Sequence, residues 1–262
     1  MRIAGLGDVA LHYRDEGDPD GPAVVFANSL GTDLRLWDDL VPLLVGGLRI
    51  IRYDKRGHGL SSCPAGPYSM GTLVRDAERL LDYLGVRDCV FVGLSIGGMI
   101  AQGLAVKRLD LVRAMVISNT AAKIGAKEVW AARMAAVREG GIEALADATM
   151  ERWFSRPFRE SPDCVLWRNM LTRQPAEGYL GCCAAISGTD FYTPTAGLTL
   201  PTLAIAGSED GSTPPDLVRE TAELVKGSRF HLVRGAGHLP CVEKPGEYAE
   251  VLNGFLKDIA HV

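Results

Sequence analysis

The sequence predicts an α/β protein with a mostly parallel central sheet that is flanked by helices and carries a helical cap. Short apolar, β-prone runs alternate with amphipathic helical patterns on both sides of one long interruption. Alternation of this kind indicates parallel strands joined by right-handed crossovers. The interruption, residues 120–189, contains no β-rich run and reads as helix throughout. We therefore expect residues 1–119 and 190–262 to form the core and residues 120–189 to form the cap.

The length and composition favour one globular domain that acts on a small molecule. The chain has 262 residues, of which 47% are hydrophobic, and this is enough for a sizeable single core. Its formal net charge is −4 and no long run of lysine and arginine occurs, which argues against nucleic acid as a partner. The first 20 residues lack the apolar core of a signal peptide, and no apolar run could cross a membrane. We expect a cytoplasmic protein with no membrane partner.

The cysteines indicate neither a disulfide framework nor a metal site. None of the six lies in a C-x-x-C pair at zinc spacing, and Cys182 and Cys183 are adjacent, which suits neither an easy disulfide nor a tetrahedral site. Free thiols in a reducing compartment are the expected state, and no metal is expected.

The first half of the chain supplies the early elements of the core. A hairpin is expected from residues 2–4 and 9–14, and a buried strand from residues 24–27 that leads into the small-residue loop 28–32. This loop offers a backbone N–H from Leu30 near the carboxyl end of the strand. The following patterns predict, in order, a helix over 36–44, a strand over 48–53, a helix over 70–84, a strand over 90–92 and a strand over 112–119.

The turn after the strand 48–53 reads Asp-Lys-Arg-Gly-His-Gly, from Asp54 to Gly59. Its Asp54 and His58 could be an acid and a base. We interpret them as structural, because they precede the candidate nucleophile described next and the acid and base of this motif class follow it.

Residues 93–97 fit the pattern G-x-S-x-G, between an apolar strand and a run of good helix formers. A serine in this context lies on a sharp strand-to-helix turn, and the two glycines avoid clashes of Cβ atoms there. Ser95 would also begin a helix, where the N–H of Ile96 points at developing negative charge. The alternative interpretation is a glycine-rich turn with an N-capping serine.

The cap contains three of the four tryptophans. Helices are expected over residues 129–138, 142–154, 164–171 and 178–186, separated by prolines. Aromatic side chains that face the strand ends would form an apolar substrate pocket. Trp130 and Trp153 fit such a pocket and an ordinary core equally well, whereas Trp167 fits a core better.

Strand patterns resume over residues 202–206 and 230–233, with helices expected over 216–225 and 247–260. Ser95, Asp210 and His238 each follow a predicted strand, and the carboxyl ends of parallel strands meet at one edge of a sheet. An imidazole that takes the serine proton, oriented by a carboxylate, makes serine a nucleophile. The order Ser, Asp, His is the one this arrangement requires. Glu209 is an alternative acid, and the weaker alternative bases are His12, His231 and His261.

These motifs resemble the α/β-hydrolase-fold serine hydrolases over nearly the whole chain. The resemblance is carried by residues 28–32, 54–59, 93–98, 119–125, 207–210 and 237–238. More narrowly, residues 93–133 and 152–154 resemble the 3-oxoadipate enol-lactonases of aromatic catabolism. General carboxylesterases and perhydrolase-type non-haem haloperoxidases are the next most similar. One departure is Asn28-Ser29, where many relatives have His-Gly; the N–H of Leu30 survives this change.

The resemblance implies hydrolysis of a small anionic enol-lactone to 3-oxoadipate, in the protocatechuate or catechol branch of aromatic breakdown, without a cofactor. The triad would be Ser95, Asp210 and His238, with the N–H groups of Leu30 and Ile96 as the oxyanion hole. An anionic substrate calls for a cation in the cap. Trp130 and Arg133, three apart on one helical face, could supply a ring wall and that cation, with Trp153 as a second wall. Other candidate cations are Lys123, Lys127 and Arg152. A receptor that only binds ligand would not need the intact Ser, Asp and His set.

Overall fold

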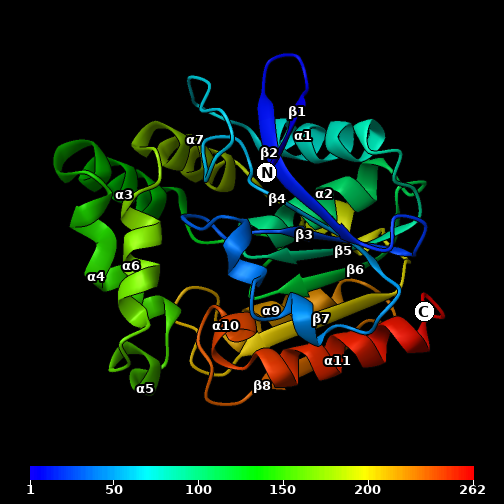
Figure 1. The fold of residues 1–262 in the computed structure, drawn as a ribbon. Coiled ribbons are helices and arrows are strands. Elements are labelled where there is room, and N and C mark those ends of the chain that lie inside the picture. The colour runs from blue at the N-terminus through cyan, green and yellow to red at the C-terminus, as the bar shows by residue number, and fades with distance from the viewer.

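A computed structural model describes all 262 residues and contains one eight-stranded sheet (Figure 1). The strand order is β1-β2-β4-β3-β5-β6-β7-β8, with β1 and β2 antiparallel to their neighbours and every later pair parallel. The expected mostly parallel sheet is therefore confirmed. The strands are β1 Arg2–Gly5, β2 Ala10–Gly17, β3 Ala23–Ala27, β4 Arg49–Tyr53, β5 Cys89–Leu94, β6 Val112–Ser118, β7 Thr202–Gly207 and β8 Arg229–Val233.

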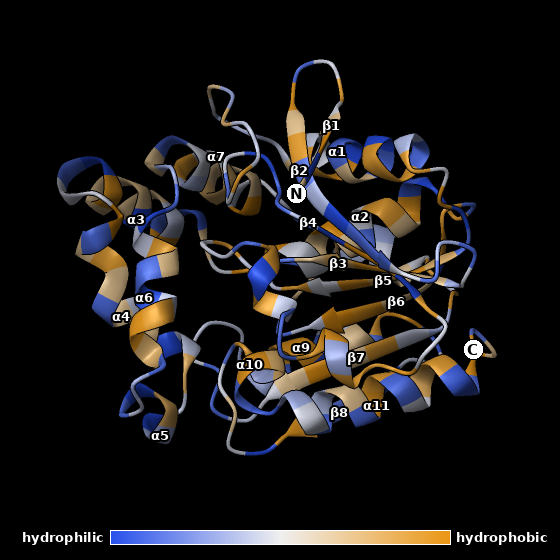
Figure 2. Ribbon diagram, in the orientation of Figure 1, coloured by the Kyte–Doolittle hydropathy of each residue, from blue (hydrophilic) through white to orange (hydrophobic).

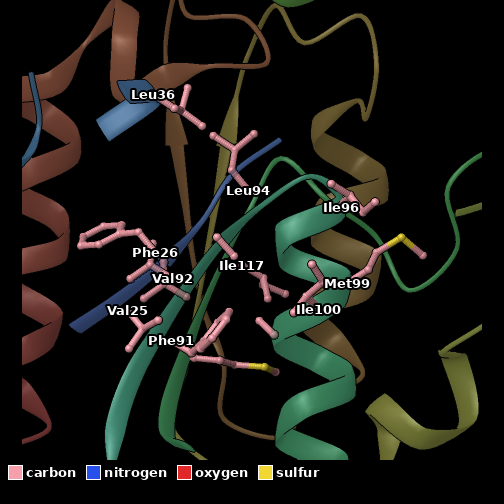
Figure 3. Close-up of a cluster of buried hydrophobic side chains, with 14 of the residues drawn as sticks. Val25, Phe26, Leu36, Phe91, Val92, Leu94, Ile96, Met99, Ile100 and Ile117 are labelled. Carbon is pink, nitrogen blue, oxygen red and sulfur yellow. The ribbon is translucent and has the colours of Figure 1, made fainter. Parts of the chain in front are cut away.

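Strand β5 lies at the centre of the sheet between β3 and β6, and all six of its residues are buried. A strand covered on both faces by helices is apolar throughout rather than alternating, which explains its sequence. Figure 3 shows Phe91 and Val92 of β5 beside Phe26 of β3 and Ile117 of β6, with side chains of the following helix against them. In Figure 2, β6 and β7 are mainly the orange of hydrophobic residues, whereas the surrounding helices alternate orange with blue.

Helices cover both faces of the sheet. Figures 1 and 3 show α2 and α11 on opposite faces, and α1 packs along α2. The stripe predicted for residues 70–84 is confirmed: α1 buries Leu73, Ala77, Leu80 and Leu81, and Gly85 follows its end with a φ of 65°. The core helices are α1 Met70–Tyr83, α2 Ile96–Lys107, α9 Pro215–Glu223, α10 Pro240–Glu243 and α11 Pro245–Asp258.

The helix expected over residues 36–44 is wrong. Two short 3₁₀ turns stand there instead, η1 Leu34–Trp37 and η2 Val41–Leu43. Asp33 caps the first turn by accepting the N–H of Arg35 with its side chain. This turn therefore begins at Leu34, two residues before the start of the expected helix. Pro42 lies in the second, has no N–H to donate, and prevents the two turns from joining into one helix.

Only helices lie between β6 and β7. Those of residues 127–172 gather beyond one end of the sheet (Figure 1, green), whereas the last, residues 192–196, packs against α2. The helix expected over residues 142–154 is a 3₁₀ turn followed by α4, a common way for a helix to begin. These elements are α3 Lys127–Gly140, η3 Ile142–Leu145, α4 Ala146–Trp153, α5 Arg156–Arg159, α6 Cys164–Thr172, α7 Ala176–Ser187 and α8 Tyr192–Ala196.

All six cysteines are free thiols, and four of them are buried. None of the helices combines the length and the apolar character that a membrane span requires.

Candidate active site

Ser95 lies in a strained turn between β5 and α2. Its backbone φ is 58° and its ψ is −119°, a conformation that non-glycine residues rarely adopt and that persists mainly at functional sites. The glycines on either side make the turn possible. A Cβ atom on Gly93 would lie 2.1 Å from the carbonyl oxygen of Gly97, and one on Gly97 would lie 2.1 Å from that of Ala27. Any larger residue at either position would push the turn apart.

The chain places the imidazole of His238 and the carboxylate of Asp210 side by side. Asp210 follows β7 and His238 follows β8, so both stand at the carboxyl edge of the sheet as Ser95 does. The Nδ1 atom of His238 lies 2.8 Å from Oδ2 of Asp210, and both side chains are buried. The carboxylate accepts the Nδ1 proton, which leaves Nε2 as the basic nitrogen.

Asp210 is held by donors on all sides. Its Oδ1 accepts the backbone N–H groups of Ser212 and Thr213 at 2.7 and 3.0 Å. Its Oδ2 accepts from Nδ2 of Asn119 at 2.8 Å and from Oγ1 of Thr213 at 2.7 Å, besides His238. Burial by itself raises the pKa of Asp210, but the charge of His238 and these hydrogen bonds outweigh burial and lower it. The carboxylate is thus ionised at neutral pH.

Glu209, the alternative acid, is exposed and makes no hydrogen bond to His238. The geometry therefore favours Asp210 over Glu209 as the partner of the imidazole.

Ser95, Ser29 and His238 line one cavity of about 330 Å³. The hydroxyl of Ser29 lies 3.5 Å from Nε2 of His238, and the Ser95 hydroxyl makes no hydrogen bond. Hydrogen bonds between nucleophile and base are often long in the free enzyme and tighten when substrate binds. Two serines consequently share this cavity with the imidazole, and only Ser95 stands on the strained turn.

Two backbone N–H groups near Ser95 are candidates for binding a substrate carbonyl oxygen, those of Ile96 and Leu30. The N–H of Ile96 belongs to the first turn of α2, where helix N–H groups lack a partner within the helix. The N–H of Leu30 makes no hydrogen bond within the protein, although Leu30 is buried at the cavity wall. Two unpaired N–H donors beside a serine hydroxyl that lines the cavity are what an oxyanion hole would require.

The cap contributes the opposite wall of the cavity. Trp130 and Trp153 are both buried and both line it, together with Arg133 and Arg152. The indole N–H of Trp130 is satisfied by the carbonyl oxygen of Ile124 at 2.6 Å, so the ring presents an apolar surface. Trp167 is buried outside the cavity lining, within the core of the cap.

Arg133 and Arg152 converge on one hydroxyl. Oγ1 of Thr149 lies 3.4 Å from Nη2 of Arg133 and 3.1 Å from Nη2 of Arg152. Arg133 also donates to the hydroxyl of Tyr179 at 2.9 Å, and its guanidinium lies 5.6 Å from the ring centre of Trp130. Neither arginine forms a salt bridge, although the chain has many. Burial, and then the charge of Arg133, lower the pKa of Arg152.

The other candidate cations lie elsewhere. Lys123 pairs with Asp190 at 3.1 Å on the surface, and Lys127 is exposed. Neither lines the cavity, whereas Arg152 does. The positive wall of the cavity is therefore formed by Arg133 and Arg152.

Of the other candidates, His231 contacts Glu247 and His261 contacts the carbonyl oxygen of Ala23, and neither lines the cavity. His12, Asp54 and His58 support the loops around the site. Nδ1 of His12 lies 2.7 Å from Oδ2 of Asp54, and Oδ1 of Asp54 accepts the N–H of Leu34. Nε2 of His58 accepts the N–H of Gly31 at 3.0 Å. These contacts agree with the structural interpretation of the turn after β4. No group of three or more His, Cys, Asp or Glu side chains is placed to hold a metal ion.

Sequence reasoning did not identify Asn119 and Thr213, which both donate to Asp210. Asn119 directly follows β6, so the rule that strand ends converge could have found it. Thr213 carries no signal beyond its position three residues after Asp210.

Comparisons with known proteins place these features in a family. Residues 22–245 match the model of the alpha/beta hydrolase fold family. The chain is 36% identical to 3-oxoadipate enol-lactonase 2 of Acinetobacter baylyi over 95% of this chain and 94% of that protein. The crystal structure of the enol-lactonase from Burkholderia xenovorans is 35% identical, with a TM-score of 0.94, and the match covers 98% of this chain and all of that one (100%). A thermophilic esterase from Thermogutta terrifontis, solved with malate bound, is 27% identical with a TM-score of 0.91 and coverage of 99% and 97%.

Proposed function

We propose, from the premise that this chain belongs to the α/β-hydrolase family, that it is a serine hydrolase that opens the ring of 3-oxoadipate enol-lactone. Ser95 is the nucleophile, His238 the base and Asp210 the acid that orients it. The N–H groups of Leu30 and Ile96 form the oxyanion hole. The product is 3-oxoadipate, and the reaction belongs to the breakdown of aromatic compounds.

Acylation begins when Nε2 of His238 takes the proton of Ser95 and Oγ attacks the lactone carbonyl carbon. The carbonyl oxygen becomes an oxyanion between the N–H groups of Leu30 and Ile96. When this intermediate collapses, the ring C–O bond breaks and the enol oxygen leaves. Because an enolate is a good leaving group, the C–O bond breaks with little help from proton transfer. The enolate then takes the proton from the imidazolium of His238, which restores the neutral base, and the resulting enol tautomerises to the ketone of the product.

Deacylation repeats the same geometry with water in place of serine. His238 takes a proton from a water molecule, whose oxygen attacks the acyl carbon on Ser95. The second tetrahedral intermediate uses the same two N–H donors. Its collapse returns the proton to Ser95 and releases the dicarboxylate.

The observation that carries the choice of substrate is the pair of arginines in the cap. Two half-buried guanidinium groups share one hydroxyl, line the cavity next to Ser95 and have no carboxylate partner. Unpaired cations in a partly desolvated site are costly unless a ligand neutralises them. A substrate with a carboxylate side chain does so, and a neutral ester does not.

The alternative is a general carboxylesterase or a perhydrolase-type enzyme with the same triad. The esterase among the similar structures supports this alternative, as do the apolar walls of Trp130 and Trp153. Both functions require Ser95. They differ in whether the negative charge of the substrate contributes to binding.

The purified protein should be assayed on 3-oxoadipate enol-lactone, followed by the loss of its ultraviolet absorbance, and beside it on p-nitrophenyl acetate. We expect kcat/KM for the lactone to exceed that for the ester by at least about a hundredfold, the contribution of one or two charge-assisted hydrogen bonds. Fast ester turnover without lactone turnover would leave the triad in place and exclude the enol-lactonase assignment. Absence of both activities would reject the hydrolase proposal.

A further inference from the structure

A buried cation that the triad does not use contacts the loop after β3. Lys55 follows β4 and is only 3% exposed, yet it forms no salt bridge. Its Nζ atom donates to the carbonyl oxygen of Ser29 at 2.6 Å and to that of Thr32 at 3.4 Å. Burying an ammonium group with carbonyl partners alone is costly, so its place needs an explanation beyond packing.

The carbonyl that Lys55 contacts belongs to a particular peptide unit. The C=O of Ser29 and the N–H of Leu30 are the two ends of one planar trans peptide, and they point in opposite directions. Lys55 holds the C=O end on the interior side. The N–H end makes no hydrogen bond within the protein, and Ser29 and Leu30 both line the cavity next to Ser95.

We propose that Lys55 is a positioning residue for the oxyanion hole: it fixes the Ser29–Leu30 peptide so that the Leu30 N–H points at the substrate carbonyl oxygen, and its charge strengthens that N–H as a donor. This inference rests on the proposed serine hydrolase function. A cation at the carbonyl oxygen draws electron density from the amide nitrogen, and hydrogen bonds in such a chain strengthen one another. The effect is greatest in the transition state, when the substrate oxygen carries a full negative charge.

The neighbouring peptide is fixed in a similar way by His58. Its Nε2 accepts the N–H of Gly31 at 3.0 Å, and burial, followed by the charge of Lys55, lowers the pKa of His58 well below its usual value. A neutral His58 keeps the lone pair that Gly31 requires. Lys55 and His58, which both lie in the turn after β4, thus hold two successive peptides of the loop after β3.

The titration of Lys55 offers a second test of its role, one that needs no variant. Burial lowers the pKa of Lys55 to about 8, although the nearby thiol of Cys182 and the carboxylates of Asp54 and Asp33 act to raise it. Burial raises the pKa of Cys182 to about 12, and His58 is already neutral, so neither changes charge between about pH 7 and pH 10. Lys55 is the group of this cluster that loses its charge there.

The test compares Lys55→Met with Lys55→Gln, and uses Lys257→Met, on the exposed surface of α11, as the control. Lys55→Met removes both the charge and the donor, whereas glutamine keeps a neutral donor. With p-nitrophenyl acetate, Lys55→Met should lower kcat by about tenfold to a thousandfold, the upper value being the loss of a whole oxyanion donor. KM should stay within about twofold. Inhibition by a trifluoromethyl ketone, which forms an oxyanion on the serine, should weaken in proportion to kcat, and Lys55→Gln should recover part of both.

The wild-type pH profile tests the same point without a variant, in case Lys55→Met does not fold by circular dichroism. Because a neutral amine still donates but carries no charge, wild-type kcat should fall several-fold near pH 8 to a lower plateau. A folded Lys55→Met with wild-type kcat, or a wild-type kcat that does not fall between about pH 7 and pH 10, would overturn the proposal. Wild-type protein without activity on the ester would instead reject the hydrolase function itself, so the two failures are distinguishable.

Discussion

The backbone N–H of His238 donates a 2.7 Å hydrogen bond to the carbonyl oxygen of Trp153. Trp153 is the last residue of α4 in the cap, whereas His238 follows the last strand of the sheet. One residue away, the N–H of Gly211, next to Asp210, donates to the carbonyl oxygen of Arg152 at 3.1 Å. The end of α4 thus lines the cavity with its side chains and holds the loops of the acid and the base with its backbone. A shift of α4 would move all three together.

Glu243 of α10 strengthens the junction between the end of α4 and the loop of His238. We predict that removing its carboxylate lowers both the stability of the protein and its turnover. Its carboxylate accepts the N–H of Gly237 at 2.7 Å, the N–H of Ser155 at 3.1 Å and the hydroxyl of Ser155. Glu243→Ala leaves these donors unpaired, so the free energy of unfolding should fall by about 2 kcal/mol or more. Turnover of p-nitrophenyl acetate should fall as well, because Gly237 precedes His238. Urea unfolding and steady-state kinetics measure the two effects.

Glu250→Ala, an exposed carboxyl on α11, is the matched control and should change neither quantity. If Glu243→Ala behaves like this control, the junction does not depend on the carboxylate.

Thr213 contributes, after His238 and Asn119, to the lowered pKa of Asp210, and this makes its contribution to stability depend on pH. Its hydroxyl donates to Oδ2 of Asp210 at 2.7 Å, one of the bonds that lower the pKa of that carboxyl. A carboxyl with a lower pKa in the folded state stabilises the fold above its unfolded pKa of about 3.9 and loses that contribution as pH falls through the lower folded value. Thr213→Val should therefore destabilise the protein most at neutral pH.

The measurement is denaturant unfolding of wild type and Thr213→Val at several pH values. The difference in free energy of unfolding should be on the order of 1–3 kcal/mol near pH 7 and should shrink as pH falls from about 4 to 2. Thr199→Val, an exposed threonine, serves as the control. A difference that is constant over the whole pH range would mean that Thr213 acts by packing alone.

We predict that a reagent that labels catalytic serines covalently reacts with Ser95 and not with Ser29. The hydroxyl of Ser29 is hydrogen-bonded to Nε2 of His238 at 3.5 Å, whereas that of Ser95 is not, but Ser29 lacks the strained turn and the adjacent N–H of Ile96. An organophosphate should therefore phosphorylate Ser95 and not Ser29, which peptide mass spectrometry can locate. Ser95→Ala should lose the label and lower kcat on the order of a millionfold, the size known for a triad nucleophile. Ser29→Ala should keep the label; phosphate found on Ser29 would contradict the assignment.

Much of this site could be predicted from the sequence because its determinants are local. The turn at Ser95 follows from glycine sterics at Gly93 and Gly97, which five consecutive residues encode. The meeting of Ser95, Asp210 and His238 follows from the parallel sheet, since each lies in the turn or loop that follows a strand whose apolar run is easy to recognise.

The rest depends on packing that no spacing encodes. Arg133 and Arg152 lie on different helices, and they meet at Thr149 only because the turn η3, which contacts both helices, brings α4 back towards α3. The sequence therefore offered Arg152 merely as one of several cations. Lys55 likewise reads as a surface charge in a polar turn, and only the tertiary fold places it behind Ser29.

We predict that replacing one arginine of the pair Arg133 and Arg152 lowers activity on an anionic substrate, whereas replacing Arg152 does not lower the stability of the protein. An anionic substrate should lose about tenfold to a hundredfold in kcat/KM when either Arg133→Met or Arg152→Met removes one charge-assisted contact. Activity on p-nitrophenyl acetate should remain within about threefold, because that ester has no carboxylate to bind. Lys123→Met, which removes a surface cation paired with Asp190, should leave both activities unchanged.

Without ligand, Arg152→Met should leave the melting temperature unchanged or raise it. The guanidinium is half-buried, has no carboxylate partner and is opposed by the charge of Arg133, which together with burial lowers its pKa. Replacing such a charge with an apolar side chain of similar length removes a cost to the folded state. A structural role for Arg152 would instead lower the melting temperature and reduce turnover of both substrates alike. Higher or equal stability with selective loss of lactone turnover can arise only if the cation is there to bind an anion.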